Sequence, residues 1–398
     1  MLRFVGYFIM DRDEFVSLYE SVTERETPGV GWESNDVVGA VRGRSVRGRS
    51  VRGRSVRGRS VRGRSVRGRS VRGRSVSGQA ELPRTVARTE WLTVGLGVAI
   101  VAMFAALTWF HRSVPLPLLL LGLAWSAAWW SSMQHELLHG HPFREARLNT
   151  AIGLMSFTLW IPFDLYRALH LRHHRDEFLT DPYEDPESYY RNGPSWIAMP
   201  EWKKKIWWIN RTLIGRLIIG PWLSVGGFLL NCARDVAADL PGARKAWLRH
   251  ACVNAFVVAW VFGICGVPVW QYFVGGIWGA TSLMKLRSFA EHRWEAEGRS
   301  RTAMVHAELP FGLLYLFNNL HHTHHARPGA AWYTLPALSK QLDSDSYAAD
   351  GAGVYRGYRD VARQYLFRPF CIPVHPAAPE AAPVMRAHME SVERAARA

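Results

Sequence analysis

Eight histidines are spaced like metal ligands in three separate stretches of this sequence. The first stretch, Gln134–His141, places His135 and His139 four residues apart at the end of a hydrophobic run. On a helix this spacing puts both imidazoles on one face. The other two stretches both read H-x-x-H-H and so present side chains at i, i+3 and i+4: His170, His173 and His174 in one, and His321, His324 and His325 in the other.

Neutral imidazoles suit iron, zinc, copper and nickel. A ninth candidate, His292, follows the fourth apolar run of the chain as His135 follows the second. Nine imidazoles are too many for one ion and suit two metals, each with four or five nitrogen ligands. Because no thiolate accompanies them, the set points to iron and oxygen chemistry. The remaining histidines are expected to be ordinary surface or core residues, or to support the ligands: His111, His141, His250, His306, His322, His375 and His388.

Metal-bound imidazoles usually donate their second N–H to a carboxylate or carbonyl. Acidic residues near the histidine stretches are candidates for this role: Glu136, Asp176, Asp181 and Glu291. Asn318 and Asn319 precede the third stretch, and either could hold a metal-bound water.

A different interpretation starts from His135-Glu136-Leu-Leu-His139, which also matches H-E-x-x-H. In zinc proteases this motif supplies two ligands and a glutamate base. That interpretation leaves both H-x-x-H-H stretches without a role. Metal analysis separates the two, because a protease would hold one zinc and the alternative two irons.

Four apolar runs are candidates for membrane crossing: Trp91–Phe110, Leu116–Met133, Ala251–Val267 and Val269–Leu283. The first contains twenty residues without a charge, which is the length needed to cross about 30 Å of hydrocarbon. Short Pro-marked turns join the runs into two helical hairpins. The sequence therefore predicts an all-α membrane protein with four crossings and a helical cytoplasmic cap that holds the histidines.

An even number of crossings returns the chain to its starting side, so the histidines and both termini are expected on one face. Only Arg112 lies in the two short turns, whereas many basic residues flank the other face: Arg84, Arg88, Arg144, Arg147, Arg244, Lys245, Arg249, Lys285 and Arg287. The positive-inside rule makes that face cytoplasmic.

The segments between the hairpins are less regular. Leu148–Pro162 is too short to span and is expected to be interfacial or re-entrant, and Trp160, with Trp125 and Trp129, is a possible lining residue of an apolar tunnel. Ile206–Leu230 is expected to form an amphipathic helix pair in the headgroup plane. A surface helix is expected over 353–366, followed by a loose tail after Pro369.

The chain has a net charge of +16, but seven copies of Val-Arg-Gly-Arg-Ser at 41–75 carry 14 Arg, so the remainder is near +2. A five-residue period fits neither helix nor strand, and disorder is expected there. Such an arm could contact the phosphate of lipid or nucleic acid. The simpler interpretation, a solvated tail from repeat expansion, is favoured, and no nucleic-acid partner is expected.

The chain is predicted to have three regions: 1–88 (N-terminal, with the repeat), 89–345 (membrane domain) and 346–398 (helix and tail). A native start after the repeat is a further hypothesis. The four cysteines form no C-x-x-C pair.

With these motifs in view, residues 90–340 resemble the integral-membrane fatty acid desaturase and hydroxylase superfamily. The resemblance rests on the three histidine stretches and the two hairpins between which they fall. Asn-Asn-Leu-His-His-Thr-His-His and the run Asp181–Ser188 are similar to bacterial members.

The resemblance implies a bacterial inner-membrane enzyme with a di-iron centre on the cytoplasmic face. It would use O2 to introduce a double bond into the acyl chain of a lipid, or alternatively to hydroxylate a lipid or hydrocarbon. Without a fused cytochrome domain, electrons would come from a separate ferredoxin-, rubredoxin- or cytochrome-type donor. A non-catalytic membrane metal-binding protein is the alternative from another class.

Overall fold

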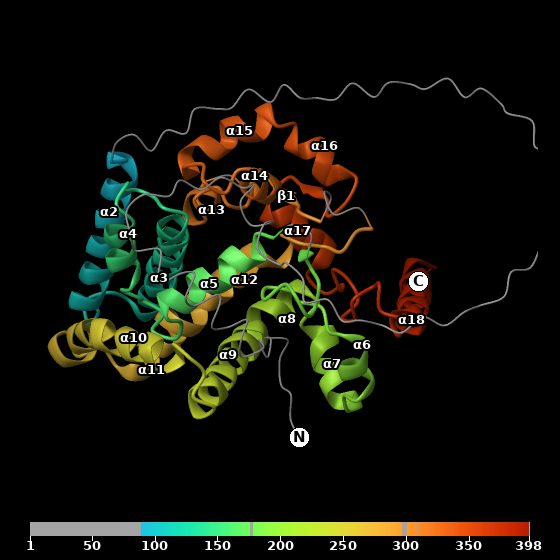
Figure 1. Ribbon diagram of the computed structural model, residues 1–398, viewed down its shortest axis with the longest axis horizontal. Coiled ribbons are helices and arrows are strands. Elements are labelled where there is room, and N and C mark those ends of the chain that lie inside the picture. Colours follow the sequence, from blue (N-terminus) through green and yellow to red (C-terminus); the bar gives the residue numbers. More distant parts are fainter. Residues whose placement is uncertain (1–88, 176–177, 297–300, 308, 398) are drawn as a thin grey trace, which may run out of the picture. The chain divides into compact units, whose positions relative to one another are not determined.

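The computed structural model describes residues 89–175, 178–296, 301–307 and 309–397, and the chain is mostly helical over these residues. The Arg-rich repeat and the rest of the predicted N-terminal region 1–88 lie outside them. Figure 1 shows the order of the elements along the chain.

The first apolar hairpin consists of α2 (Trp91–Trp109) and α3 (Leu116–Leu138). Pro115 caps α3, and Pro117 lies in its first turn, where its missing N–H removes no helical hydrogen bond. Helix α3 runs five residues beyond the expected end at Met133, so His135 is still helical and His139 is the C-cap. His135 and His139 therefore lie in the last turn and at the C-cap of the apolar helix α3.

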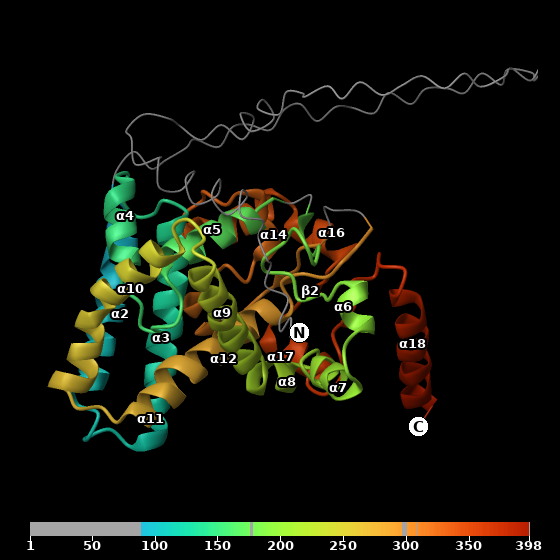
Figure 2. The ribbon, with the colours of Figure 1, turned by 60° about the horizontal axis from the view of Figure 1, so that its bottom comes forward.

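Within the described residues, three helical segments are long and apolar enough to cross a membrane: α2, α3, and Ala243–Ile264, which joins α10 (Ala243–Val258) to the π-helix η3 (Ala259–Ile264). The third predicted crossing, Ala251–Val267, overlaps this last segment, which begins eight residues earlier and ends three residues earlier than expected. In Figures 1 and 2, α2, α3 and α10 lie near one another at one end of the described region.

The fourth predicted crossing, Val269–Leu283, is also helical but is not among those three segments. It lies in a continuous run of α11 (Val269–Tyr272), η4 (Phe273–Gly279) and α12 (Ala280–Phe289). Its glycines serve close packing against α3: a Cβ on Gly275 would lie 3.0 Å from the Leu120 carbonyl oxygen, and one on Gly279 would lie 2.9 Å from Ala124 Cβ. Small residues allow helix backbones to approach closely in this way.

Between the apolar segments, short helices carry the chain across the histidine-bearing region. The expected re-entrant segment Leu148–Pro162 contains most of one helix and a non-helical stretch, 154–162, that leads into the next. The expected helix pair at Ile206–Leu230 is three helices, because the helical backbone is interrupted after Ile209 and again at Ile219. The helices of this part are α4 (Ala146–Gly153), α5 (Phe163–His173), α6 (Gly193–Ile197), α7 (Glu201–Ile209), α8 (Leu213–Ile218) and α9 (Gly220–Ala237).

The C-terminal part consists of short helices and one small parallel pair of strands. Strand β1 (Met304–Val305) pairs with β2 (Val354–Tyr355) in the register Met304 to Val354. The expected surface helix over 353–366 is therefore β2 followed by a shorter helix, and helix also occupies most of the tail after Pro369. The helices are α13 (Phe311–Leu314), α14 (His321–Ala326), η6 (Trp332–Thr334), α15 (Leu335–Gln341), α16 (Ser344–Ala349), α17 (Tyr358–Tyr365) and α18 (Ala381–Arg397).

A continuous apolar core connects the hairpins to the region that bears the histidines. Phe104 of α2 stacks on Phe157 with ring centroids 3.9 Å apart, and Trp130 of α3 packs on the same ring at 5.0 Å. Trp130 Nε1 donates to the Met155 carbonyl at 2.7 Å, and Gln134 Nε2 donates to Gly153 at 2.7 Å. These contacts hold the segment after α4 against the end of α3, next to His135.

Candidate metal centre

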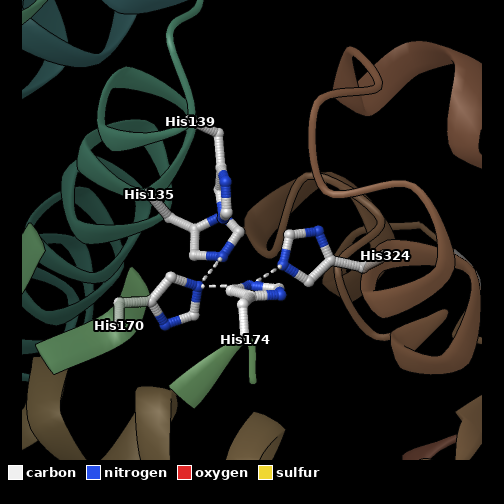
Figure 3. Close-up of side chains that lie close together, drawn as sticks. All are labelled: His135, His139, His170, His174 and His324. Atoms are coloured by element: carbon white, nitrogen blue, oxygen red, sulfur yellow. Dashed lines mark hydrogen bonds between the residues drawn. The ribbon is translucent and has the colours of Figure 1, made fainter. Parts of the chain in front are cut away.

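The structure brings nine histidines together in two groups. We call the first the His135 group; one nitrogen from each of its five rings lies within 4.8 Å of the others: His135, His139, His170, His174 and His324. Figure 3 shows these rings converging from α3, from α5 and its C-terminal end, and from α14. Residues up to 189 positions apart in the sequence therefore share one small volume.

We call the second set the His173 group; it meets the same distance limit with four rings: His173, His292, His321 and His325. Each H-x-x-H-H stretch contributes to both groups, because its two histidines four residues apart belong to one group and the histidine between them belongs to the other. The ring centroids of His174 and His325, one from each group, are only 4.4 Å apart. The two groups are thus adjacent, as two ions in a shared site require.

Short distances join the Nε2 atoms within each group. In the His135 group, His170 Nε2 lies 3.0 Å from Nε2 of both His135 and His174. In the His173 group, His292 Nε2 lies 3.0 Å from His173 Nε2 and 2.8 Å from His321 Nε2. Metal–imidazole bonds are about 2.0–2.1 Å long, so two nitrogens at right angles around one ion are about 3.0 Å apart.

The outer nitrogens of these rings face acceptors, which fixes the tautomers. His170 Nδ1 lies 2.8 Å from Glu187 Oε1, and His173 Nδ1 lies 2.8 Å from Asp185 Oδ1. Because an ionised carboxylate can only accept, Nδ1 carries the proton and Nε2 presents a lone pair to the group.

Two further rings of the His173 group also direct Nδ1 towards acceptors. His292 Nδ1 lies 3.3 Å from the Arg301 carbonyl oxygen, and His321 Nδ1 lies 3.2 Å from the Asn318 carbonyl oxygen. When all three rings are neutral and those protons are directed outward, as metal binding requires, lone pairs on three neighbouring Nε2 atoms face each other at about hydrogen-bond distance. A cation between them removes this repulsion, so the donor set fits a metal ion.

In the His135 group, His139 Nε2 is buried and has no hydrogen-bond partner among the described residues. An unpaired buried polar atom is costly and calls for a ligand. Burial also lowers the pKa of His139, and the neighbouring His170 lowers it further. The His139 ring lies beside four other imidazoles, and the neutral form is the one in which histidine binds metals.

Burial lowers the pKa of most other histidines in both groups, including His174 and His324. His173 differs: burial lowers its pKa, but Asp185 and Glu187 outweigh this and raise it to about 9. The negative charge that stabilises a proton on His173 is the charge that would stabilise a bound cation beside it. The carboxylates therefore belong to the electrostatics of the site.

Local hydrogen bonds hold the loop that supplies these carboxylates. Asp185 Oδ2 accepts from the Thr180 N–H at 2.8 Å, and its Oδ1 accepts from the Glu187 N–H at 2.8 Å. Ser188 Oγ donates to the Thr180 carbonyl at 2.6 Å. Asp185 and Glu187 lie in the run Asp181–Ser188 that resembles bacterial members of the family, but they were not predicted as partners of the histidines. Their spacing of 12 and 17 residues from His173 and His170 has no periodic signal; the acidic run itself was the available clue.

Some of the acids and amides expected to support the ligands contact a histidine of the two groups, and others bond elsewhere. Glu291 Oε1 lies 3.5 Å from His321 Nδ1, and the Asn318 side chain lies 3.2 Å from His135 Nε2. Asp181 instead accepts from the backbone N–H groups of Tyr183 and Glu184, and Asn319 donates to the Val305 carbonyl. Asp176 lies outside the described residues.

Glu136, the glutamate of the H-E-x-x-H match, lies behind His135. Its Oε1 is 3.8 Å from His135 Nδ1, the nitrogen opposite the converging Nε2, and its Oε2 accepts from the Trp332 N–H at 3.2 Å. A general base for a metal-bound water would have to lie on the Nε2 side. The geometry thus favours a supporting role for this carboxylate over the protease interpretation.

Other histidines lie apart from the two groups. His141 is buried, and its Nδ1 lies 2.8 Å from Glu90 Oε1. Of the two alternatives predicted for His141, exposure to solvent is therefore wrong. His322 stacks on Tyr347 at 5.2 Å. Neither of the two groups contains any of the remaining five: His111, His250, His306, His375 and His388.

A cavity of about 1270 Å³, counted with its open mouth, lies next to the His135 group. Gln134 and Glu187 are part of its wall, and both are immediate neighbours of the group: one precedes His135, the other bonds His170. Trp160 also lines it, whereas Trp125 and Trp129 do not appear in its wall.

One comparison with known proteins identifies a relationship. The family model described as "Fatty acid desaturase" matches residues 108–356, which is more than half of the chain and includes all nine converging histidines. A search of the curated proteins found no match.

Proposed function

The chain belongs to the fatty acid desaturase family, which implies an oxidoreductase and a membrane protein acting on lipid, and from this premise we propose that it is an O2-dependent di-iron desaturase that introduces a double bond into a lipid acyl chain. The single observation that supports this most strongly is the convergence of nine imidazoles, six buried and three partly buried, into two adjacent groups.

In this proposal each group holds one iron ion through Nε2 atoms. Five ligands come from the His135 group and four from the His173 group: His135, His139, His170, His174 and His324, and His173, His292, His321 and His325. Imidazole-rich sites suit iron among the redox-active metals, and adjacent sites suit a pair of ions. When bound, the two irons supply the oxidising power, drawn from O2 and external electrons, that removes hydrogen from an unactivated carbon.

The protein's own residues would orient the rings and the substrate. Asp185 and Glu187 fix the tautomers of His173 and His170 by accepting their Nδ1 protons. The cavity wall includes Ile161, Leu169 and Met284, apolar side chains against which a methylene chain can lie. Burial of the rings excludes water from the reacting carbon.

The membrane arrangement follows from the same proposal. The three apolar segments and the helical run Val269–Phe289 would make four crossings, with the histidines in a cytoplasmic cap of a bacterial inner-membrane protein. A separate ferredoxin-, rubredoxin- or cytochrome-type protein would deliver the electrons.

Lipid mass spectrometry tests the function directly. Cells that express the chain should contain acyl chains lighter by two hydrogens than cells that lack it, and this difference should disappear without O2. A gain of one oxygen in place of that loss would identify a hydroxylase. Metal analysis of the purified protein should find two irons per chain; one zinc would support the protease interpretation, and metal without any change in lipids would indicate a metal-binding protein.

A further inference from the structure

Three cationic side chains contact Tyr189, a residue of the cavity wall: Arg216 and Lys285, which also line the cavity, and Arg211, which does not. The Arg216 guanidinium carbon lies 3.8 Å from the centre of the Tyr189 ring, Lys285 Nζ lies 3.1 Å from the Tyr189 hydroxyl, and Arg211 Nη2 donates to the Tyr189 carbonyl at 2.7 Å. None of the three forms an ion pair with a carboxylate among the described residues. A buried positive charge without a counter-charge is expensive.

Arg216 is the most deeply placed of these cations, with 2% of its surface exposed. Its Nε donates to the Asn210 carbonyl at 3.0 Å, but Nη1 is buried and has no hydrogen-bond partner among the described residues. Burial lowers its pKa to about 10, so the side chain remains charged at neutral pH. The fold therefore holds a charged donor at the cavity wall with one N–H group unsatisfied.

Tyr189 responds to this positive field. Burial raises its pKa, but Lys285 and Arg216 outweigh that effect and bring the pKa below its ordinary value. Its hydroxyl lies 2.8 Å from Ser288 Oγ and lines the cavity with both cations. The local surroundings thus favour a negative charge at this part of the wall.

Neighbouring side chains do not supply a negative charge to balance Arg216 and Lys285. Arg287 also lines the cavity, but its Nε lies 3.2 Å from Glu291 Oε1 and this pair compensates itself. Glu187, the carboxylate in the wall, accepts from His170 Nδ1. The stacking of Arg216 on Tyr189 and its bond to a backbone carbonyl stabilise the guanidinium in part, yet both leave the net charge in place.

We propose that Arg216 and Lys285 bind the anionic headgroup of an amphipathic lipid, a carboxylate or a phosphate, whose hydrocarbon chain lies along the apolar wall of the same cavity. The inference rests on the proposed function, and it adds that the substrate carries a negative charge. Guanidinium groups match both anions, because their N–H donors lie in one plane and can form paired hydrogen bonds.

The cavity has the mixed wall that such a ligand needs. Cations and Tyr189 occupy one part, and Ile161, Leu169, Leu223 and Met284 supply apolar surface in the same space. Glu187 and Gln134 connect that space to the histidines. An anchored headgroup would fix which methylene of the chain reaches the metal-binding region.

Equilibrium binding of chain-matched amphiphiles tests the site without turnover. Metal-loaded protein in a neutral detergent is titrated with dodecanoate, dodecyl phosphate and dodecanol, using isothermal calorimetry. Wild-type protein should bind at least one of the two anions about tenfold more tightly than the alcohol, and the anion that binds more tightly identifies the headgroup class.

Two variants and one control locate the binding. Arg216→Gln and Lys285→Gln should each abolish the preference for the anion while dodecanol binds as before, and Arg216→Lys should restore part of it. Arg244→Gln, an exposed arginine paired with Asp239 at 3.3 Å, should bind like the wild type. Unchanged iron content and unchanged dodecanol affinity show that a variant is folded.

The results also separate this inference from the proposed function. Equal affinity of the wild type for the alcohol and both anions, or an undiminished anion preference in Arg216→Gln and Lys285→Gln, would overturn the anion site even if desaturation is observed. An Arg216-dependent preference in a protein that changes no lipid would keep the anion site and reject the desaturase.

Discussion

His173 Nδ1 and Asp185 Oδ1 lie 2.8 Å apart, and both side chains are almost fully buried. The same carboxylate also accepts from the Thr180 and Glu187 N–H groups. Asp185 thus joins a loop to one ring of the His173 group and sets that ring's orientation and tautomer.

Asp185→Asn should therefore impair metal binding in the His173 group. The amide is nearly the same size but carries no charge and can present an N–H to His173, which would favour the wrong tautomer. We expect iron affinity or activity to fall about 10–100-fold, the usual effect of removing a partner of a metal-bound histidine. Metal analysis after dialysis, together with turnover, measures this.

Glu184→Gln is the matched control, because Glu184 lies in the same loop but pairs with Arg172 at 2.8 Å and contacts no histidine of either group. It should keep its iron and its activity. Equal losses in both variants would show that the loop, and not the carboxylate on His173, determines metal binding.

Neighbouring histidines of α14 provide a second comparison. His324→Ala removes a ring of the His135 group and should abolish turnover and lower iron content. His322→Ala removes a ring that stacks on Tyr347 and should leave at least half of the activity. Membrane insertion, measured by cell fractionation, should be unchanged in both variants. Full activity of His324→Ala would contradict the ligand assignment.

Local spacing selected eight of the nine histidines that the structure brings together, and the position of His292 after the fourth apolar run selected the ninth. Helical periodicity puts residues i, i+3 and i+4 on one face of a helix, and the second and fourth apolar runs end shortly before His135 and His292. Whether these residues bind metal stays a prediction. What spacing could not give was the division into two groups, because it depends on how α5 and α14 are rotated about their axes.

Long-range partners were beyond the sequence. Asp185 and Glu187 reach His173 and His170 through a loop with a left-handed residue, Thr180 at φ 71°, and no periodic pattern predicts that path. Helix bounds were also affected by tertiary packing. The helical run that begins at Val269 continues to Phe289, six residues beyond the predicted apolar run Val269–Leu283, and it includes the polar residues Gln271 and Lys285.

Acidification should release metal and destabilise the fold. Burial lowers the pKa of His139, His170, His174 and His324 below 6.5. The unfolded chain then binds more protons than the folded chain, so this contribution to stability is complete above pH 6.5 and is lost as pH falls through the lowered folded values. His173, raised to about 9, acts oppositely: its contribution is complete below pH 6.5 and is lost as pH rises through 9.

The measurable result is the pH at which iron leaves. Because four ligands stay neutral below the ordinary histidine pKa, half of the iron should remain bound at a pH clearly below 6.5. Dialysis at a series of pH values followed by metal analysis gives this midpoint, and thermal unfolding at each pH gives the stability. A midpoint at or above 6.5 would contradict the role of burial.

Close helix packing at Gly279 predicts a stability effect. A Cβ there would lie 2.9 Å from Ala124 Cβ and 2.9 Å from the Val274 carbonyl oxygen, so α3 and η4 would have to separate. Gly279→Ala should lower the free energy of unfolding by about 1–3 kcal/mol. Gly226→Ala in α9, where nothing lies within 4 Å, should leave stability unchanged or raise it by up to about 1 kcal/mol. Thermal unfolding in detergent compares them, and equal melting temperatures would refute the packing argument.

Filling the cavity should separate substrate access from metal binding. Ser224 of α9 is buried and lines the cavity beside Leu223, so Ser224→Phe would occupy space that an acyl chain needs without touching a histidine. We expect iron content to stay as in the wild type and turnover of long acyl chains to fall at least about tenfold, with shorter chains affected less. Ser346→Phe, on the exposed side of α16, adds the same ring outside the cavity and should be neutral. If Ser224→Phe processes long chains at the wild-type rate, the acyl chain does not lie in this cavity, and the headgroup site at Arg216 would lose its connection to the reaction.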